Sequence, residues 1–175
     1  LLAGTTDLFK LTPADAGQEK AVLEDVYPNF GGHLRGGFIS HREGKLIARC
    51  GLQGIRFGLH ALLLNGHPAS NRMALPEVRL GHAHAPDWQT FQRHLEFRLT
   101  QGSYRKTDDE VLGLHDILAL LQEEDGEHGL RAFFAEVCEG NARLTAALEA
   151  RGMLLRAPLD HDAKVKRIFG AIPKG

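Results

Sequence analysis

The spacing of hydrophobic positions predicts a chain in which strands and helices alternate. Alternation of apolar and polar residues, or a short apolar run, predicts strands over residues 7–11, 38–41, 45–50, 51–64, 78–84, 130–137 and 153–156. Recurrence near every 3.6 residues predicts helices from Thr12 to about Pro28, over residues 86–100 and 107–124, and from Asn141 to Gly152. Residues 164–171 fit either a last strand or a short helix.

Residues near the predicted helix ends support several of these assignments. Thr12 precedes Pro13 at the start of the first helix, and Thr107 forms a capping box with Glu110 at the start of the third. Arg42-Glu43-Gly44 predicts the turn of a hairpin between residues 38–41 and 45–50.

The segment from Gly129 to Met153 carries the strongest local signals. A short apolar run over residues 130–137, bounded by glycine, favours a buried strand. Asn141 follows as a helix cap, and Gly152 stands where a left-handed residue ends a helix. The segment therefore predicts a strand, a capped helix and a second strand.

Composition narrows the class of protein. The chain has 175 residues, 43% hydrophobic and 25% charged, with a net charge of −1, which predicts one domain spanning residues 1–175. The absence of a basic surplus argues against nucleic acid or an anionic membrane as partner. Cys50 and Cys138 are expected to be buried, reduced thiols in a cytoplasmic protein. Because the first residue is leucine, we expect a domain taken from a longer polypeptide.

Two parts of the chain resemble the Gcn5-related N-acetyltransferase (GNAT) superfamily. Asn141, Gly152 and Met153 keep the spacing of that family's closing helix, and "LTPADA" leading to "VYPNF" resembles its opening strand and helix. The resemblance implies an α/β fold with a mixed, mostly antiparallel central sheet and helices on both faces. It also implies transfer of an acetyl or acyl group from acetyl-CoA or another acyl-CoA to an unidentified amine on a small molecule or a protein.

The resemblance also suggests which residues form the site. The bases expected near strand 78–84 are Glu77, His82 and His84. The family binds the CoA pyrophosphate on a loop before its third helix, and the residues placed there or at the closing helix are Gln101, Gly102, Ser103, Arg105, Lys106 and Asn141.

The sequence departs from the family pattern at two positions that matter for chemistry. Tyr104 and Lys106 stand where the phosphate loop has small residues, and Asp108-Asp109-Glu110 follow with three carboxylates. An alternative alignment of the family's phosphate loop, which is incompatible with the capping box, places Gly113 and His115 in that loop. Leu148 replaces the tyrosine that often protonates the leaving thiolate, and leucine has no proton to give.

Other functions remain open at this stage. The missing features are typical of a non-catalytic acetyltransferase-like domain used for regulation or protein contact. The closing segment also resembles that of sulfate-transporter and anti-sigma-antagonist interaction modules. His82 and His84 would lie on one face of a strand at metal-ligand spacing, but we expect partly satisfied histidines there and no metal. The oligomeric state is not indicated.

Overall fold

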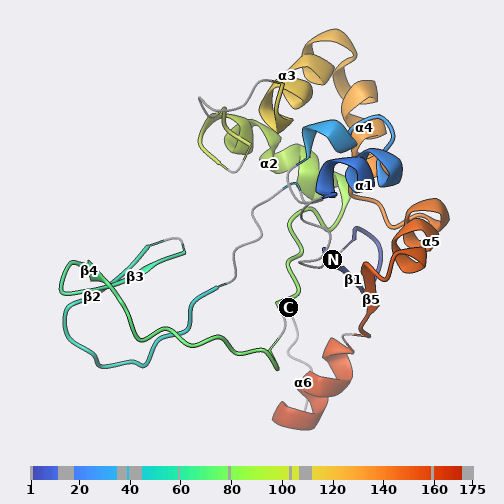
Figure 1. Cartoon of the computed structure of the whole chain (residues 1–175). Coiled ribbons are helices and arrows are strands. Elements are labelled where there is room, and N and C mark those ends of the chain that lie inside the picture. Colours follow the sequence, from blue (N-terminus) through green and yellow to red (C-terminus); the bar gives the residue numbers. More distant parts are fainter. Residues whose placement is uncertain are drawn as a thin grey trace.

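We describe the fold from a computed structural model of the chain (Figure 1). The described residues are 2–11, 18–34, 39, 45–58, 60–78, 80–102, 104–106, 112–158 and 160–170. In chain order they form β1 (Asp7–Phe9), α1 (Glu19–Val26), the 3-10 turn η2 (Gly31–His33), β2 (Ile55–Phe57), β3 (Leu62–Leu64), β4 (His67–Pro68), α2 (Trp88–Thr100), α3 (Leu114–Glu124), α4 (Gly126–Val137), α5 (Ala142–Ala150), β5 (Leu154–Arg156) and α6 (His161–Phe169).

The protein combines helices with antiparallel strands, so the predicted α/β class is confirmed. The described strands form two separate sheets rather than one. In the first, β1 pairs with β5, with Leu8 opposite Leu155. In the second, β2, β3 and β4 form a meander. Figure 1 shows the meander at a distance from the helices, whereas β1 and β5 lie beside α5.

The prediction of a strand over residues 130–137 is wrong. These residues belong to α4, which begins at Gly126. Leu130, Phe133, Phe134 and Val137 follow an i, i+3, i+4, i+7 pattern and are all buried, while Arg131 between them is exposed. This is the periodicity of an amphipathic helix. The apolar run looked too short for a helix because the first turn of α4 is polar.

Aromatic side chains from α2 and α4 form the centre of the core. Phe91 and Phe133 are fully buried, with 0% of their surface exposed. The Phe91 ring lies 5.5 Å from that of Phe134, and the Phe133 ring meets that of Phe30 edge-on at 5.1 Å. Trp88 stacks on Phe91 at 5.6 Å and packs, partly buried, against the core. Such pairs add to the stabilisation that burial of the rings provides.

The predicted cap of α5 is confirmed. The Asn141 side-chain oxygen accepts a hydrogen bond of 2.9 Å from the Leu144 amide, and its nitrogen donates to the Ala135 carbonyl at 3.2 Å. One side chain therefore satisfies an amide at the start of α5 and a carbonyl at the end of α4.

The predicted end of α5 is also confirmed. Gly152 adopts φ +63°, its amide donates to the Glu149 carbonyl at 2.9 Å, and the Met153 amide donates to the Leu148 carbonyl at 2.8 Å. These two bonds form a Schellman motif, which requires a left-handed residue at Gly152. The strand predicted over residues 153–156 follows as β5.

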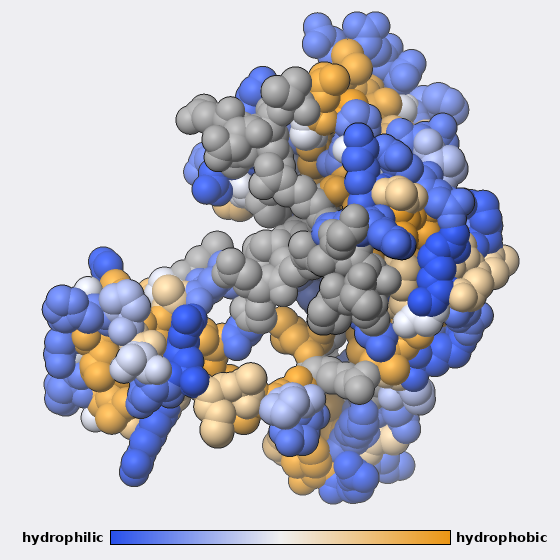
Figure 2. Space-filling view, viewed as in Figure 1, coloured by the Kyte–Doolittle hydropathy of each residue, from blue (hydrophilic) through white to orange (hydrophobic). Residues whose placement is uncertain are grey.

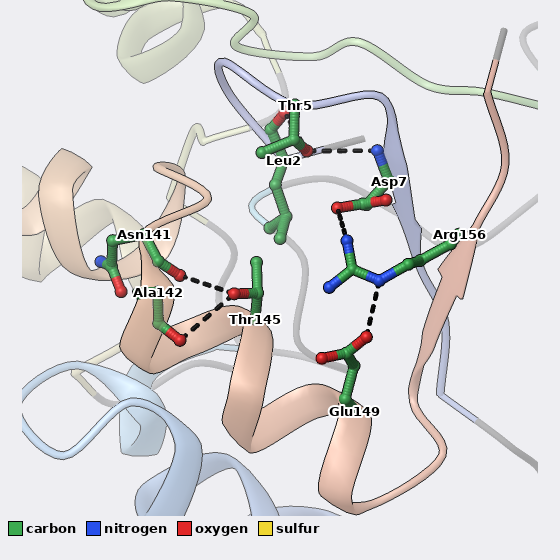
Figure 3. Close-up of polar contacts among 8 residues, drawn as sticks. All are labelled: Leu2, Thr5, Asp7, Asn141, Ala142, Thr145, Glu149 and Arg156. Carbon is green, nitrogen blue, oxygen red and sulfur yellow. Dashed lines mark hydrogen bonds and ion pairs between the residues drawn. The ribbon is translucent and has the colours of Figure 1, made fainter.

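An ion-pair network joins the first sheet to α5 (Figure 3). Arg156 on β5 donates from Nη1 to Asp7 on β1 at 3.0 Å and from Nε to Glu149 on α5 at 2.6 Å. Asp7 is buried and Glu149 exposed. The hydrogen bond from Arg156 holds the pKa of Glu149 below its ordinary value. The two ends of the chain are thereby held together.

Four other assignments are corrected or only partly tested. Residues 45–50 and the described part of 78–84 form no strand, and α3 begins at Leu114 instead of Thr107. Residues 161–169 form the helix α6. Alternation alone does not make a strand where no neighbouring strand supplies hydrogen bonds. The helix start at Thr12, the turn at 42–44 and the capping box at 107–110 lie outside the described residues.

The segment between residues 45 and 84 forms an extended arm that carries β2, β3 and β4. Strand signals within residues 51–64 are confirmed as β2 and β3. Asn65 and Gly66 turn the chain with φ +52° and +83°, the positive values that a tight hairpin requires. The turn leads back into β4, where His67 pairs with Leu64.

In the part of the chain that the structure describes, no helix has the length and apolar character needed to cross a membrane.

Candidate functional site

A cluster of three side chains lies where the segment before α2 meets the loop after it; we call His84, Arg98 and Tyr104 the tyrosine cluster. The Nε2 atom of His84 lies 3.0 Å from the Tyr104 hydroxyl oxygen. Arg98 donates from Nη1 to the same hydroxyl at 3.3 Å and from Nη2 to the His84 carbonyl at 2.7 Å. The Arg98 guanidinium also lies 5.5 Å from the centre of the Tyr104 ring.

Both ends of α2 position this cluster. At the N-terminus, Asp87 accepts a 2.7 Å hydrogen bond from the Thr90 amide, which starts the helix three residues after His84. At the C-terminus, the Tyr104 amide donates to the Arg98 carbonyl at 3.0 Å, so the chain folds back on the last turn. A Cβ on Gly102 would lie 2.7 Å from the Arg98 Cα. Glycine is therefore required for this return.

The electrostatics of the cluster favour an anion. Arg98 is half-buried, and its partners above are neutral. Within the described residues no carboxylate pairs with it. Burial raises the pKa of Tyr104 above its ordinary value, so the phenol keeps its proton at neutral pH. Since Arg98 can only donate, the Tyr104 oxygen accepts, and the phenol hydrogen is available to His84. A half-buried cation of this kind is a binding group for carboxylate or phosphate.

Two exposed cations follow Tyr104 on the loop to α3. Arg105 donates to the Gly102 carbonyl at 3.3 Å. Lys106 pairs with Asp116 at 3.0 Å, and this hydrogen bond lowers the pKa of the Asp116 carboxyl. His115 Nδ1 lies 3.1 Å from the Tyr104 carbonyl oxygen. These two contacts attach the first turn of α3 to the loop. They bring His115, and with it Gly113 at the start of α3, next to the loop.

The structure brings together several of the residues predicted for the site. The His82 ring lies 5.3 Å from that of His84, and Gln101, Gly102, Arg105 and Lys106 flank Tyr104 in sequence. Two of the three predicted bases, His82 and His84, therefore lie at the tyrosine cluster, and the predicted phosphate loop contributes Tyr104 to it.

Other predicted residues lie elsewhere. Asn141 serves as the cap of α5. The spacing between Asn141 and Gly152 is therefore explained by the start and end of one helix. Glu77 is exposed in the arm, and no described contact joins it to the cluster. Ser103 lies outside the described residues.

Arg98 and Tyr104 were not predicted as functional residues. By helical periodicity Arg98 lies outside the apolar stripe of α2 that contains Phe91 and Leu95, yet it is half-buried. Tyr104 looked like a misfit in a loop of small residues, whereas only 1% of its surface is exposed. The one feature of the sequence that could have indicated this site is a single aromatic residue, Tyr104, between Gly102 and the two cations Arg105 and Lys106.

The cysteines do not supply a nucleophile at this site. Cys138 is buried as expected, and burial raises its pKa to about 12, so the thiol is protonated at neutral pH. Cys50 was expected to be buried but is exposed on the arm. Both are free thiols. Among the described residues, no group of three or more His, Cys, Asp or Glu side chains is placed to hold a metal ion.

Comparison of the chain with protein-family models, curated proteins and solved structures finds no match. The acetyltransferase resemblance consequently rests on the residue pattern alone.

Proposed function

We propose that the tyrosine cluster, with Arg105 and Lys106 beside it, binds an anionic group of a substrate or cofactor. The single observation that carries this proposal is the half-buried Arg98, whose hydrogen-bond partners, the Tyr104 hydroxyl and the His84 carbonyl, are neutral. A guanidinium in a partly desolvated position binds phosphate more strongly than a fully solvated lysine does.

The ligand that we propose to test first is acyl-CoA, because the resemblance implies it and its phosphates fit these donors. Arg98, Arg105 and Lys106 would hold the phosphates, and Lys106 would exchange Asp116 for the ligand. A bound acyl-CoA would supply the thioester carbonyl that an amine attacks; as the C–N bond forms, the C–S bond breaks and CoA would leave as a thiolate that takes a proton from water. The finer fold that the resemblance implies, an acetyltransferase-like central sheet, is part of this proposal; the described strands form two separate sheets, of which β1 with β5 is one.

His82 and His84 are the groups proposed to take a proton from the attacking ammonium. Imidazole titrates close to neutral pH and can therefore exchange protons there. The Tyr104 hydroxyl holds His84 Nε2 by a hydrogen bond, which orients the ring. In this proposal Tyr104 positions the base and does not donate a proton to the leaving group, since its pKa is raised.

A thermal-shift panel tests the proposal. Acetyl-CoA, CoA and inorganic pyrophosphate are expected to raise Tm in proportion to their affinity, because a ligand that binds only the folded state stabilises it. Sodium acetate and neutral pantetheine serve as controls and are expected to leave Tm unchanged. A shift with pyrophosphate but not with acetyl-CoA supports an anion site and refutes the acyl-CoA assignment. No shift with any anion refutes both and favours the non-catalytic interaction domain.

A further inference from the structure

The described part of the arm, within residues 45–84, has an apolar face with exposed side chains. In the pairing of β2 with β3, Ile55 stands opposite Leu64 and Phe57 opposite Leu62. Since alternate residues of a strand point to the same side, these four share one face of the meander. Phe57 is 57% exposed and Leu64 40%. In the described part of the arm, Ala69 is the one buried residue. Figure 2 shows apolar atoms gathered on this part of the surface.

Charge indicates what the partner is. The arm has one acidic residue, Glu77, and five basic ones: Lys45, Arg49, Arg56, Arg72 and Arg79. Its net charge is thus +4, and the rest of the chain carries −5, since the whole chain carries −1. The two parts of one chain are complementary in charge, which favours and orients their association.

The acidic counterpart lies where α3 passes into α4. Glu123, Glu124, Asp125 and Glu127 are exposed there. Leu120, one turn earlier on α3, is 50% exposed. We call these five residues the acidic junction. The exposed Leu120 side chain can contact the apolar face of the arm, and the carboxylates can pair with the basic residues of the arm.

We propose that the arm docks on the acidic junction of a second copy of this chain. In the resulting two-fold dimer, the arm of each chain binds the acidic junction of the other. A two-fold interface uses the same two patches twice. The β4 edge contains Pro68, which has no amide hydrogen for further strand pairing, so growth of the sheet at that edge is disfavoured. The inference is independent of the proposed ligand of the tyrosine cluster.

Light scattering after size exclusion tests the assembly. The expected mass is twice 19.2 kDa at micromolar concentration. The double substitution Phe57→Glu with Leu64→Glu is expected to give a monomer of 19.2 kDa, because two charges would be buried at the interface. Phe169→Glu on α6 is the matched control, since Phe169 is 72% exposed and outside the arm. A monomeric wild type, or a dimer that survives the arm substitutions, would overturn the proposal, as would loss of the dimer in the control.

Cross-linking tests the contact itself. Cys50 is the exposed thiol on the arm, whereas Cys138 is buried. A photo-cross-linker on Cys50 in a mixture of ¹⁴N- and ¹⁵N-labelled chains is expected to give mixed-isotope products with peptides containing residues 120–127. Products of a single isotope only would show that the arm folds onto its own chain, and mixed products at other peptides would place the interface elsewhere; either result overturns the proposal.

Discussion

His84 and Tyr104, twenty residues apart in the sequence, are joined by a 3.0 Å contact between imidazole Nε2 and the phenol oxygen. Arg98 binds both residues, at the carbonyl of one and the hydroxyl of the other. These bonds fix the segment before α2 against the loop after it. The same bonds leave a half-buried guanidinium without a described carboxylate, and the proposed anion site depends on that arrangement.

The two buried tyrosines should respond differently to loss of the hydroxyl. Tyr104→Phe is expected to lower the free energy of unfolding by about 1–3 kcal/mol, because His84 and Arg98 lose their shared partner. Tyr27→Phe is the matched control: Tyr27 is also 1% exposed, but its hydroxyl has no hydrogen-bond partner among the described residues. Removing an unsatisfied buried hydroxyl is expected to be neutral or stabilising. Urea unfolding measures both, and equal losses would refute the cluster as described.

Stability is expected to fall in acid through three carboxylates. The pKa values of Asp87, Asp116 and Glu149 are each lowered, by hydrogen bonds from the Thr90 amide, Lys106 and Arg156 respectively. A carboxylate with a lowered pKa stabilises the fold fully above its unfolded value of about 4 and loses that effect as pH falls through the folded pKa. Urea midpoints from pH 7 to pH 2.5 should decline mainly below about pH 4. Flat midpoints in that range would contradict these contacts.

The helical core around α4 predicts a large cost for truncating Phe133. Phe133→Ala is expected to destabilise the protein by about 3–5 kcal/mol, because it leaves a cavity at a fully buried site. Phe97→Ala on α2, where the ring is 59% exposed, should change stability by no more than about 0.5 kcal/mol. Chemical unfolding of the two variants separates the outcomes. Comparable losses in the two variants would contradict the full burial of Phe133.

The contribution of the Asn141 cap to the stability of the fold should be measurable on its own. Asn141→Ala is expected to cost about 1 kcal/mol, while Asn141→Asp should retain most of the stability, because a carboxylate also accepts from the Leu144 amide. Thermal unfolding of the two variants gives the difference. If Asn141→Asp lost as much as Asn141→Ala, the side chain would not act by capping the helix.

The parts of the fold that could be predicted are those specified by neighbouring residues. The Asn141 cap and the Gly152 stop each depend on a backbone requirement that one residue satisfies. The α4 error arose because the length of the apolar run was given more weight than its period. The wrongly predicted strand over residues 78–84 arose because alternation says nothing about whether a partner strand is near.

The site depended on contacts that no local pattern encodes. His82, His84 and the loop at residues 101–106 could be singled out by residue type, but their meeting depends on the length of α2 and on the close return at Gly102. The partial burial of Arg98 could not be predicted, because helical periodicity gives the direction of a side chain from its own helix and not the segments that fold over it.

The most direct test of the anion site is calorimetric titration of acetyl-CoA and of pyrophosphate into the wild type, Arg98→Gln and Arg93→Gln. Arg93 is exposed on the same helix and controls for loss of a positive charge. Titrations are made below the Tm of each variant, with circular dichroism to confirm the fold. We expect wild type and Arg93→Gln to bind alike and Arg98→Gln to bind at least about tenfold more weakly, the effect of losing one charge-assisted hydrogen bond. Equal affinity of Arg98→Gln and wild type, or no binding of either anion by the wild type, would contradict the account.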